Sequence, residues 1–277
     1  MSETPATKAE AVAPVTARID GRPVRLDAFY DGAFAVFQPQ GWGYRSGLDA
    51  LLLAACVPHE RAGRIADLGA GSGVVGFAAA HRAPGAAVML AEAEPVMVEL
   101  CRSSIDQPQN LKLSSRLSVA TIDIGAPRKI REAAGLPDSA FDLVLTNPPF
   151  HPANHRRTPD PVRDRALFAS ADMTLDRWVA VAAALLAPGG RLVTVLRGDL
   201  LAGALKALRG GLGGLTILPV HTKEGAPAER VVIAAKKGSR APLKLLAGIV
   251  LNDAAGRPTA LCQDISKGTA TLDLARS

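Results

Sequence analysis

The segment best suited to chemistry is Asn147-Pro148-Pro149-Phe150, which follows the short apolar run 141 to 146. Because proline has no N–H, this segment offers the Asn147 amide and carbonyl oxygens but few backbone donors. The side-chain oxygen of Asn147 and the carbonyl oxygen of Pro148 could therefore accept both hydrogens of an aromatic amine and orient its lone pair toward an electrophile. Phe150 could stack on the base that carries the amine. A simple turn after a strand is the alternative, since Asn and Pro are both common in turns.

A glycine-rich loop earlier in the chain has the composition of a cofactor-binding loop. Asp67 closes a strand-like run and precedes glycines at alternate positions, Gly69, Gly71 and Gly73. Glycines let the backbone approach a ligand closely, and the helix expected next would add N–H donors. The stretch 71 to 76 also fits the dinucleotide pattern G-x-G-x-x-G, so the glycines alone leave NAD and other adenosine cofactors open. The Asp67 carboxylate favours S-adenosylmethionine, because a cationic sulfonium tolerates a nearby negative charge better than a pyrophosphate does.

Acidic residues follow the next two predicted strands. Glu92 lies about twenty positions past the glycine loop, where a carboxylate can bind two ribose hydroxyls. Glu94 directly precedes Pro95 and is better assigned to the start of the following helix. Asp123 could accept a hydrogen bond from the adenine amine of the cofactor, and a helix cap is an equally open interpretation.

A second glycine-spaced segment precedes the first predicted helix. Residues 42 to 45 could close over a ligand, with Tyr44 and Arg45 binding the substrate, or they could form a packed connector. Ser46 is the expected N-cap of an apolar helix that runs to about residue 56.

The charge distribution favours a polyanionic partner. The 277 residues carry a net charge of +6, with an excess of +2 in the stretch 151 to 165 and of +4 in the stretch 221 to 244. Such local excess suits RNA, although a modest run of charge is usually a solvated surface. The residues predicted to hold phosphates are Arg156, Arg157, Lys236, Lys237 and Arg240.

Other features of the composition exclude several classes of protein. Gly, Pro or charge interrupts every apolar run, so no membrane span is expected. Cys56, Cys101 and Cys262 are scattered and have no C-x-x-C spacing, which predicts no metal site and the reducing cytoplasm. Residues 1 to 17 are polar and are expected as a flexible leader without the apolar core of a signal peptide.

Strands and helices alternate along most of the chain and predict an α/β fold. The expected architecture is a doubly wound, mostly parallel seven-stranded sheet with a terminal antiparallel hairpin and a small N-terminal β element. The loop 151 to 168 is expected as a lid or substrate clamp. After a strand that begins at Arg64, the predicted strands are 87 to 91, 117 to 120, 141 to 146, 191 to 196, 215 to 220 and 230 to 235, with a strand-like segment at 245 to 251. The predicted later helices are 74 to 81, 95 to 106, 171 to 186 and 199 to 208.

This pattern divides the chain into a leader and three structured parts. The expected parts after the leader are 18 to 58, an N-terminal β element and helix; 59 to 240, the cofactor-binding domain; and 241 to 277, a C-terminal strand and tail packed on that domain.

With these motifs in place, residues from about 60 to 237 resemble the class I S-adenosylmethionine-dependent methyltransferases. The loop 67 to 73 matches their cofactor loop, Glu92 their ribose-binding acid, and 147 to 150 the motif of amino-methylating members. Within that class the chain is similar to the bacterial group that contains the tRNA1(Val) adenine-37 N6-methyltransferases. The segments that carry this closer resemblance are 43 to 54, 147 to 150, 219 to 232, 237 to 243 and 256 to 259.

The resemblance implies methyl transfer to an exocyclic amine, with adenine N6 in tRNA as the first candidate and the base flipped out of its loop to reach the site. A protein glutamine amide is the nearest alternative, because it also presents an NH2 group. A small-molecule amine or hydroxyl is another, and a hydroxyl would need a base such as His151 or His155. An NAD-dependent oxidoreductase would explain only the glycine loop, and a non-catalytic RNA-binding module would explain only the charge.

Overall fold

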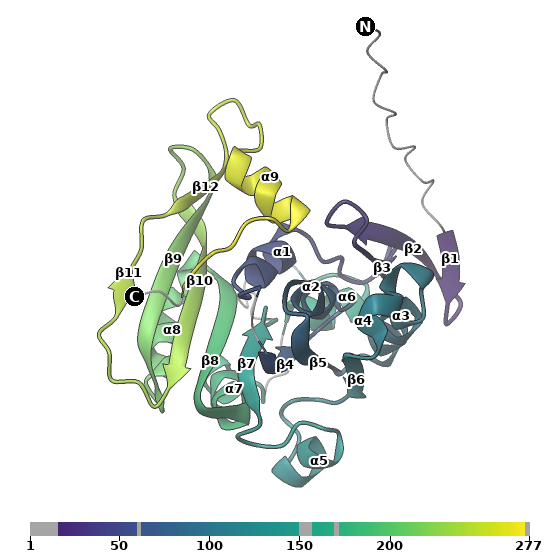
Figure 1. Cartoon of the computed structure of the whole chain (residues 1–277), viewed down its shortest axis with the longest axis horizontal. Helices are drawn as coiled ribbons and strands as arrows, with labels where there is room; N and C mark the ends of the chain where they lie inside the picture. The colour runs from purple at the N-terminus through teal and green to yellow at the C-terminus, as the bar shows by residue number, and fades with distance from the viewer. Residues whose placement is uncertain (1–15, 60–61, 150–156, 169–171, 275–277) are drawn as a thin grey trace, which may run out of the picture.

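The computed structural model describes residues 16 to 59, 62 to 149, 157 to 168 and 172 to 274. These residues form two sheets, and helices cover both faces of the larger one (Figure 1). The smaller sheet is antiparallel and has the order β1-β2-β3, which confirms the predicted N-terminal β element. Its strands are β1 (Thr16–Ile19), β2 (Arg22–Phe29) and β3 (Phe34–Pro39).

The larger sheet has the strand order β11-β9-β10-β8-β7-β4-β5-β6, and β12 also pairs with β9. Strands β4 to β8 are parallel to one another, whereas β10 is antiparallel to both β8 and β9. The predicted doubly wound sheet with a terminal hairpin is therefore confirmed, and two short strands extend it beyond the expected seven. The strands are β4 (Ala62–Leu68), β5 (Gly85–Glu92), β6 (Leu117–Thr121), β7 (Phe141–Thr146), β8 (Leu186–Arg197), β9 (Leu212–Lys223), β10 (Ala228–Lys237), β11 (Lys244–Leu245) and β12 (Ile249–Asn252).

Alternate residues of the central strands face two apolar layers, as expected for a sheet covered on both sides. Ile65 and Leu143 belong to the layer under α1, α2 and α9, whereas Ala66 and Val144 belong to the layer under α7 and α8. The helices are α1 (Leu48–Ala55), α2 (Val74–Arg82), α3 (Pro95–Ile105), α4 (Leu111–Ser114), α5 (Arg128–Ala133), α6 (Pro161–Leu167), α7 (Leu175–Leu185), α8 (Leu201–Leu208) and α9 (Ala260–Lys267). None of those described is long and apolar enough to cross a membrane.

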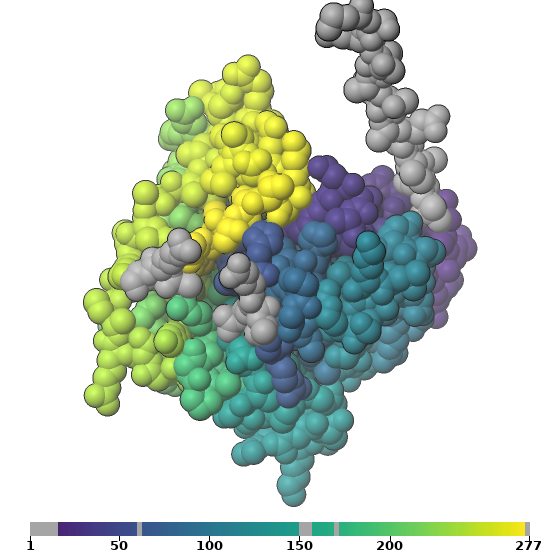
Figure 2. Space-filling view, viewed as in Figure 1, coloured from purple at the N-terminus to yellow at the C-terminus, as the bar shows by residue number. Residues whose placement is uncertain are grey.

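The C-terminal segment packs back onto the N-terminal part of the chain. Figure 2 shows it, in yellow, lying against the purple and blue surface of the N-terminal sheet and α1. The Leu272 N–H donates to the Ala55 carbonyl oxygen at 2.8 Å, just where α1 ends. This bond joins the C-terminal segment to the end of α1, and both contribute to the same apolar layer.

The predicted N-cap at Ser46 is wrong. Helix α1 starts at Leu48, and its N-cap is Gly47, which makes no side-chain capping bond. Ser46 is held instead by Gln38, whose side-chain oxygen accepts the Ser46 N–H at 2.8 Å. A tertiary contact from β3 thus replaces the local cap that the sequence pattern suggested.

The expected loop 151 to 168 contains a helix, α6, over its second half. Asp160 is its N-cap and accepts hydrogen bonds from the N–H groups of Val162 and Arg163. Pro161 occupies the first helical position, where its missing N–H costs nothing. The pair Asp-Pro is a local helix-start signal that the sequence interpretation did not use.

Three other predicted elements have different bounds in the structure. Helix α7 starts at Leu175, because Thr174 caps it, and ends at Leu185. Strand β8 begins at Leu186, before the predicted start at residue 191. The segment predicted as one strand at 245 to 251 is split into β11 and β12, both parallel to β9.

Candidate active site

A cavity of about 380 Å³ opens at the edge of the larger sheet where β4, β5, β6 and β7 end. In doubly wound sheets ligands bind at this edge, because the carboxyl ends of the parallel strands meet there. The volume lies within the usual range of small-molecule and cofactor sites. The predicted site residues that border the cavity are Tyr44, Asp67, Gly69, Gly71, Glu92, Asp123, Asn147 and Pro148.

The glycine loop follows β4 and leads into α2 as expected, but its glycines have different surroundings. Gly71 has a φ of 57°, and a Cβ added there would meet only the end of Met97, at 4.0 Å, so the position is open toward the cavity. Gly73 has a φ of 91° and does not border the cavity. A Cβ on Gly73 would lie 2.7 Å from Leu90 and 3.1 Å from Cys101. Gly73 therefore lets α2 pack on β5, and its contact with the cofactor stays a prediction.

Two carboxylates lie beneath this loop. Asp67 is 1% exposed and accepts the Gly76 N–H at 2.9 Å. Burial raises the pKa of its carboxyl to about 7, against the opposing effect of that N–H. Glu92 accepts the N–H groups of Gly71 and Glu94, each at 2.8 Å, and burial raises its pKa as well. A carboxylate has about four acceptor positions, so Glu92 keeps capacity for ribose hydroxyls.

Asp123 lies at the cavity just after β6. It accepts the Gly125 N–H at 2.8 Å and so forms a local turn. It does not cap α5, whose N-cap is Pro127, so the helix-cap interpretation is wrong. Ile122 and Ile124, on either side of Asp123, are buried and also line the cavity. A flat base could pack against these two apolar side chains while its amine donates to the Asp123 carboxylate.

The Asn147 corner is held by a chain of hydrogen bonds that the sequence did not reveal. Trp178 on α7 donates from Nε1 to Thr146 Oγ1 at 3.0 Å, and that hydroxyl donates to the Leu68 carbonyl oxygen at 2.8 Å. The Trp178 ring also lies against Gly69, where an added Cβ would be 3.2 Å from it. Trp178 thus joins the ends of β4 and β7 at the cavity wall. A tryptophan in an apolar helix carries no sequence signal that distinguishes it from a core residue.

Residues from α1 and α6 complete the wall, and a residue of β10 is paired with one of them. Asp49 of α1 lines the cavity and forms an ion pair with Arg230 of β10, with Nε to Oδ1 at 2.5 Å. Burial raises the pKa of Tyr44, and the Asp49 carboxylate adds to that rise. Arg165 of α6 lines the cavity and is paired with Glu94. These partners come together only through tertiary packing, so sequence reasoning missed Asp49, Arg165 and Arg230.

A hydrogen bond joins the N-cap of α6 to the connector, the segment 43 to 47 that precedes α1. The Gly43 N–H donates to Asp160 Oδ2 at 2.6 Å. Arg45 does not border the cavity, because its guanidinium is paired with Asp27 of β2. Arg157 likewise lies away from the cavity lining and is paired with Asp164. Both are more than 40% exposed at the side chain, so they remain accessible from outside.

The three basic residues at the end of β10 lie at the other edge of the sheet. Because β10 is antiparallel to β8, Arg230 is opposite Arg197, where β8 ends, whereas Lys236 is opposite Arg191, in the middle of β8. Lys237 donates to the Leu186 carbonyl oxygen at 2.6 Å. Lys236, Lys237 and Arg240 thus lie away from the cavity, and their role in holding phosphates stays a prediction.

Four residues named in the sequence interpretation lie outside the described part of the chain. They are Phe150, His151, His155 and Arg156. Within the described part, no group of three or more His, Cys, Asp or Glu side chains is arranged to hold a metal ion.

Comparison with known proteins identifies the family. Residues 47 to 218 match the family model described as the methyltransferase small domain. A tRNA1(Val) (adenine(37)-N6)-methyltransferase from Porphyromonas gingivalis is 30% identical over 163 residues, which cover 57% of this chain and 61% of that protein. A release factor glutamine methyltransferase from Bifidobacterium longum is 33% identical over 153 residues, which cover 52% of this chain and 51% of that protein. The chain thus matches between half and two thirds of the length of these two relatives.

A solved structure from Agrobacterium tumefaciens, described as a predicted O-methyltransferase, is similar over nearly its whole length. It has a TM-score of 0.69 and 34% identity, and the match covers 81% of this chain and 98% of that one. The family model covers more than half of the chain, and the fold and the cavity agree with it. The chain therefore belongs to the methyltransferase small domain family.

Proposed function

We propose that the protein transfers a methyl group to an exocyclic amine, with adenine N6 in a tRNA as the first candidate acceptor. The observation that carries this proposal is the corner after β7. There Asn147 and Pro148 border the cavity, and the Asn147 amide makes no hydrogen bond to another described residue. The amide oxygen and the adjacent proline carbonyl are then free to accept the two hydrogens of an amine. Phe150 is the proposed stacking residue for the base.

The donor half of the cavity fits S-adenosylmethionine in size and chemistry. Gly71 leaves open space for close approach, Glu92 retains acceptor positions for the ribose, and Asp123 lies between two apolar side chains suited to adenine. We assign these three residues, with Asp67, Gly69 and Asn147, to cofactor binding. When bound, S-adenosylmethionine supplies an electrophilic methyl group on a cationic sulfur.

An amine acceptor agrees with the acid–base groups of the cavity. A neutral aromatic amine can attack before it loses a proton, whereas a hydroxyl needs a base. Among the described residues that line the cavity there is no histidine, and Asp49 is paired with Arg230. Orientation by Asn147 and Pro148 is therefore the contribution we expect from the chain.

Two acceptors remain to be separated. A tRNA is supported by the relatives that are named as tRNA adenine methyltransferases and by the net charge of +6. It would place the enzyme in the cytoplasm, with Tyr44 at the cavity and the exposed Arg45 and Arg157 outside its lining as candidate contacts. A protein glutamine amide is the second candidate, because the glutamine methyltransferase relative is 33% identical and a glutamine side chain also presents an NH2 group.

Transfer of tritiated methyl groups tests both. Total tRNA from cells that lack this protein and a release-factor substrate are offered in parallel to the parent enzyme and to Asn147→Ala. We expect label in one tRNA adenosine. We expect the variant to lose about 100-fold to 1,000-fold in kcat, with a much smaller loss of affinity for S-adenosylmethionine, because the other residues assigned to the cofactor remain. Asn252→Ala is the matched control, because that amide donates to the Thr222 carbonyl oxygen at 2.7 Å on β12, away from the cavity.

Label in the release factor alone would replace tRNA by the glutamine amide. If Asn147→Ala transferred methyl groups at the parental rate to either acceptor, the proposed role of the corner would be wrong.

A further inference from the structure

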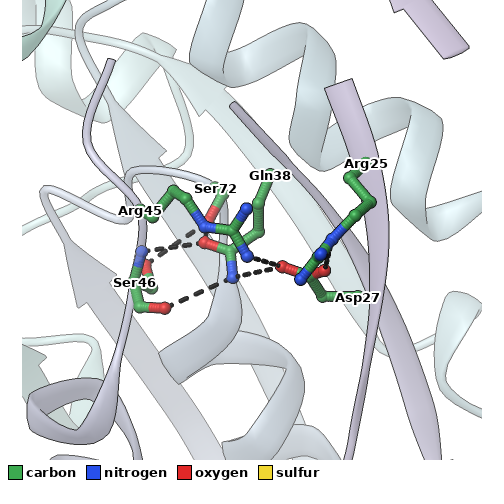
Figure 3. Close-up of polar contacts among 6 residues, drawn as sticks. All are labelled: Arg25, Asp27, Gln38, Arg45, Ser46 and Ser72. Atoms are coloured by element: carbon green, nitrogen blue, oxygen red, sulfur yellow. Dashed lines mark hydrogen bonds and ion pairs between the residues drawn. The ribbon is translucent and has the colours of Figure 1, made fainter. Parts of the chain in front are cut away.

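The side chain of Gln38, at the end of β3, joins the small N-terminal sheet to the cavity wall (Figure 3). Gln38 is 2% exposed. Its Nε2 donates to Asp27 Oδ2 at 3.1 Å and to the Ser46 carbonyl oxygen at 3.3 Å. Its Oε1 accepts the Ser46 N–H at 2.8 Å and the Ser72 hydroxyl at 3.3 Å. A primary amide has two donor hydrogens and two acceptor positions, so the full capacity of this side chain is used.

The two serines belong to the two segments that enclose the donor. Ser72 is fully buried and lies in the glycine loop between Gly71, which faces the cavity, and Gly73. Ser46 lines the cavity from the connector, two residues after Tyr44. The two hydroxyl oxygens are also 3.3 Å apart, within hydrogen-bonding distance. Gln38 therefore lies behind the wall and fixes the connector against the loop.

Asp27 of β2, which does not line the cavity, fixes the orientation of the Gln38 amide. The Asp27 carboxylate accepts hydrogen bonds from Arg25 at 2.6 Å and from Arg45, and its side chain is only 11% exposed (Figure 3). A carboxylate that already holds two guanidinium groups can only accept, so the NH2 group of Gln38 must point toward it. The amide oxygen of Gln38 is then turned toward Ser46 and Ser72.

We propose that Gln38 is a positioning residue for the methyl donor. Through this one amide the N-terminal sheet sets the place of the connector 43 to 47 relative to the glycine loop, and thereby the shape of the donor side of the cavity. The small sheet is then part of the cofactor site, although none of its residues borders the cavity. The inference concerns only the donor, so it holds for either acceptor.

A second buried amide, at the end of the one-turn helix 108 to 110, contacts the same strand and provides a control. Asn110 is fully buried, accepts the Ala35 N–H at 3.0 Å, and donates to the carbonyl oxygens of Ala35 and Ser104, each at 2.6 Å. It anchors the opposite end of β3 and touches neither the connector nor the glycine loop. Loss of Asn110 should destabilise the sheet at least as much as loss of Gln38, without changing the cavity.

The test is calorimetric titration of the full-length protein with S-adenosylmethionine, together with hydrogen exchange of backbone amides. Gln38→Met keeps the length of the side chain and removes its hydrogen bonds; we expect about tenfold weaker binding. Ser72→Ala removes only the loop contact, and we expect about threefold weaker binding. Asn110→Leu should bind within twofold of the parent although its melting temperature falls.

Hydrogen exchange gives a readout that general destabilisation would not reproduce. In Gln38→Met the amides of residues 43 to 47 should exchange at least tenfold faster, whereas Ala35 should be unchanged. In Asn110→Leu the opposite pattern is expected, because the Ala35 N–H loses its acceptor.

Binding by Gln38→Met within twofold of the parent, or equal weakening by Asn110→Leu, would overturn the proposal. If Gln38→Met does not fold, Ser72→Ala decides alone. Parental affinity together with parental exchange at 43 to 47 in that variant would then reject a positioning role.

Discussion

The cavity and the surroundings of Arg82 both bury polar groups, but they use their hydrogen-bonding capacity differently. Arg82, at the end of α2, is 1% exposed and donates to the carbonyl oxygens of residues 55, 57 and 268 and to Thr271 Oγ1, at 2.8 to 3.4 Å. At the cavity, Glu92 has acceptor positions left over, and Asn147 makes no hydrogen bond to another described residue.

This contrast separates polar groups that stabilise the fold from polar groups that are available to bind a ligand. Nearly all buried polar groups in proteins are hydrogen-bonded, since an unsatisfied one costs about 1 to 3 kcal/mol. Acceptor capacity that the protein leaves unused inside the cavity is therefore available to a ligand. Four predictions test the contrast, from the largest expected effect to the smallest.

Replacing Arg82 with Met should give the largest effect, and only on stability. The change leaves buried carbonyl oxygens of two distant segments without a donor, so we expect the free energy of unfolding to fall by about 4 kcal/mol. For a chain of this size that corresponds to a decrease of roughly 8 to 16 °C in melting temperature, measured by calorimetry. The rate of methyl transfer per folded molecule should stay at the parental value. A variant that melts within 2 °C of the parent would show that the guanidinium is not what joins these segments.

Asp67→Asn should instead change how stability depends on pH. Burial raises the pKa of Asp67 from 3.8 to about 7, so between these pH values the unfolded chain releases a proton that the folded chain keeps. The free energy of unfolding of the parent therefore falls as the pH rises through this window, whereas asparagine has no proton to lose. Because each unit of pKa shift corresponds to 1.36 kcal/mol, the variant should gain roughly 3 kcal/mol on the parent between pH 5 and pH 8.

Urea unfolding of the cofactor-free proteins at several pH values measures this gain. Asparagine can still accept the Gly76 N–H, so the fold should be preserved. If the free energies of unfolding of parent and variant changed in parallel between pH 5 and pH 8, the Asp67 carboxyl would be ionised in the folded protein over that whole range. The raised pKa would then be wrong.

The parts of the site that were predictable from sequence are those set by short stretches of chain. Asp67, Glu92, Asp123 and Asn147 each follow or end a strand, and the alternation of strands and helices was enough to expect parallel pairing. Parallel strands bring their carboxyl ends to one edge, so four separate motifs converge on one cavity without any knowledge of side-chain contacts. The fold class followed from the same alternation.

The parts that were not predictable depend on contacts between distant residues. Ser46 looked like a helix cap because its partners, Gln38 and Ser72, are 8 and 26 positions away. Lys236 looked like a site residue because it belongs to a basic stretch, but the direction of its antiparallel strand takes it away from the cavity. Neither the partners of Ser46 nor the direction of β10 can be inferred from residue spacing along the chain.

Trp178→Phe should weaken catalysis more than binding. The variant keeps an aromatic ring beside Gly69 but loses the hydrogen bond from Nε1 to Thr146 Oγ1, which supports the strand end before Asn147. Loss of one such bond suggests a fall in kcat of about tenfold, with a smaller change in the affinity for S-adenosylmethionine.

Trp42→Phe is the matched control for this prediction. Its Nε1 also donates one hydrogen bond, to the Pro23 carbonyl oxygen at 2.7 Å, but Trp42 does not border the cavity. Steady-state kinetics on both variants would contradict the proposed support of the corner if their kcat values fell equally.

The smallest effects are expected at the far end of β10, where the contrast can be repeated with two adjacent lysines. Lys237 donates to the Leu186 carbonyl oxygen, so Lys237→Met should lower the free energy of unfolding by about 1 kcal/mol. Lys236 is exposed, so Lys236→Met should leave stability within about 0.5 kcal/mol of the parent. Neither change should alter the affinity for S-adenosylmethionine, because both lysines lie at the edge of the sheet opposite the cavity.

The affinity for tRNA, measured at several salt concentrations, then decides whether Lys236 has any role in function. A salt dependence reduced by about one phosphate contact would mean that a bound tRNA extends along the sheet to this edge, and an unchanged one would confine its contacts to the side of the cavity.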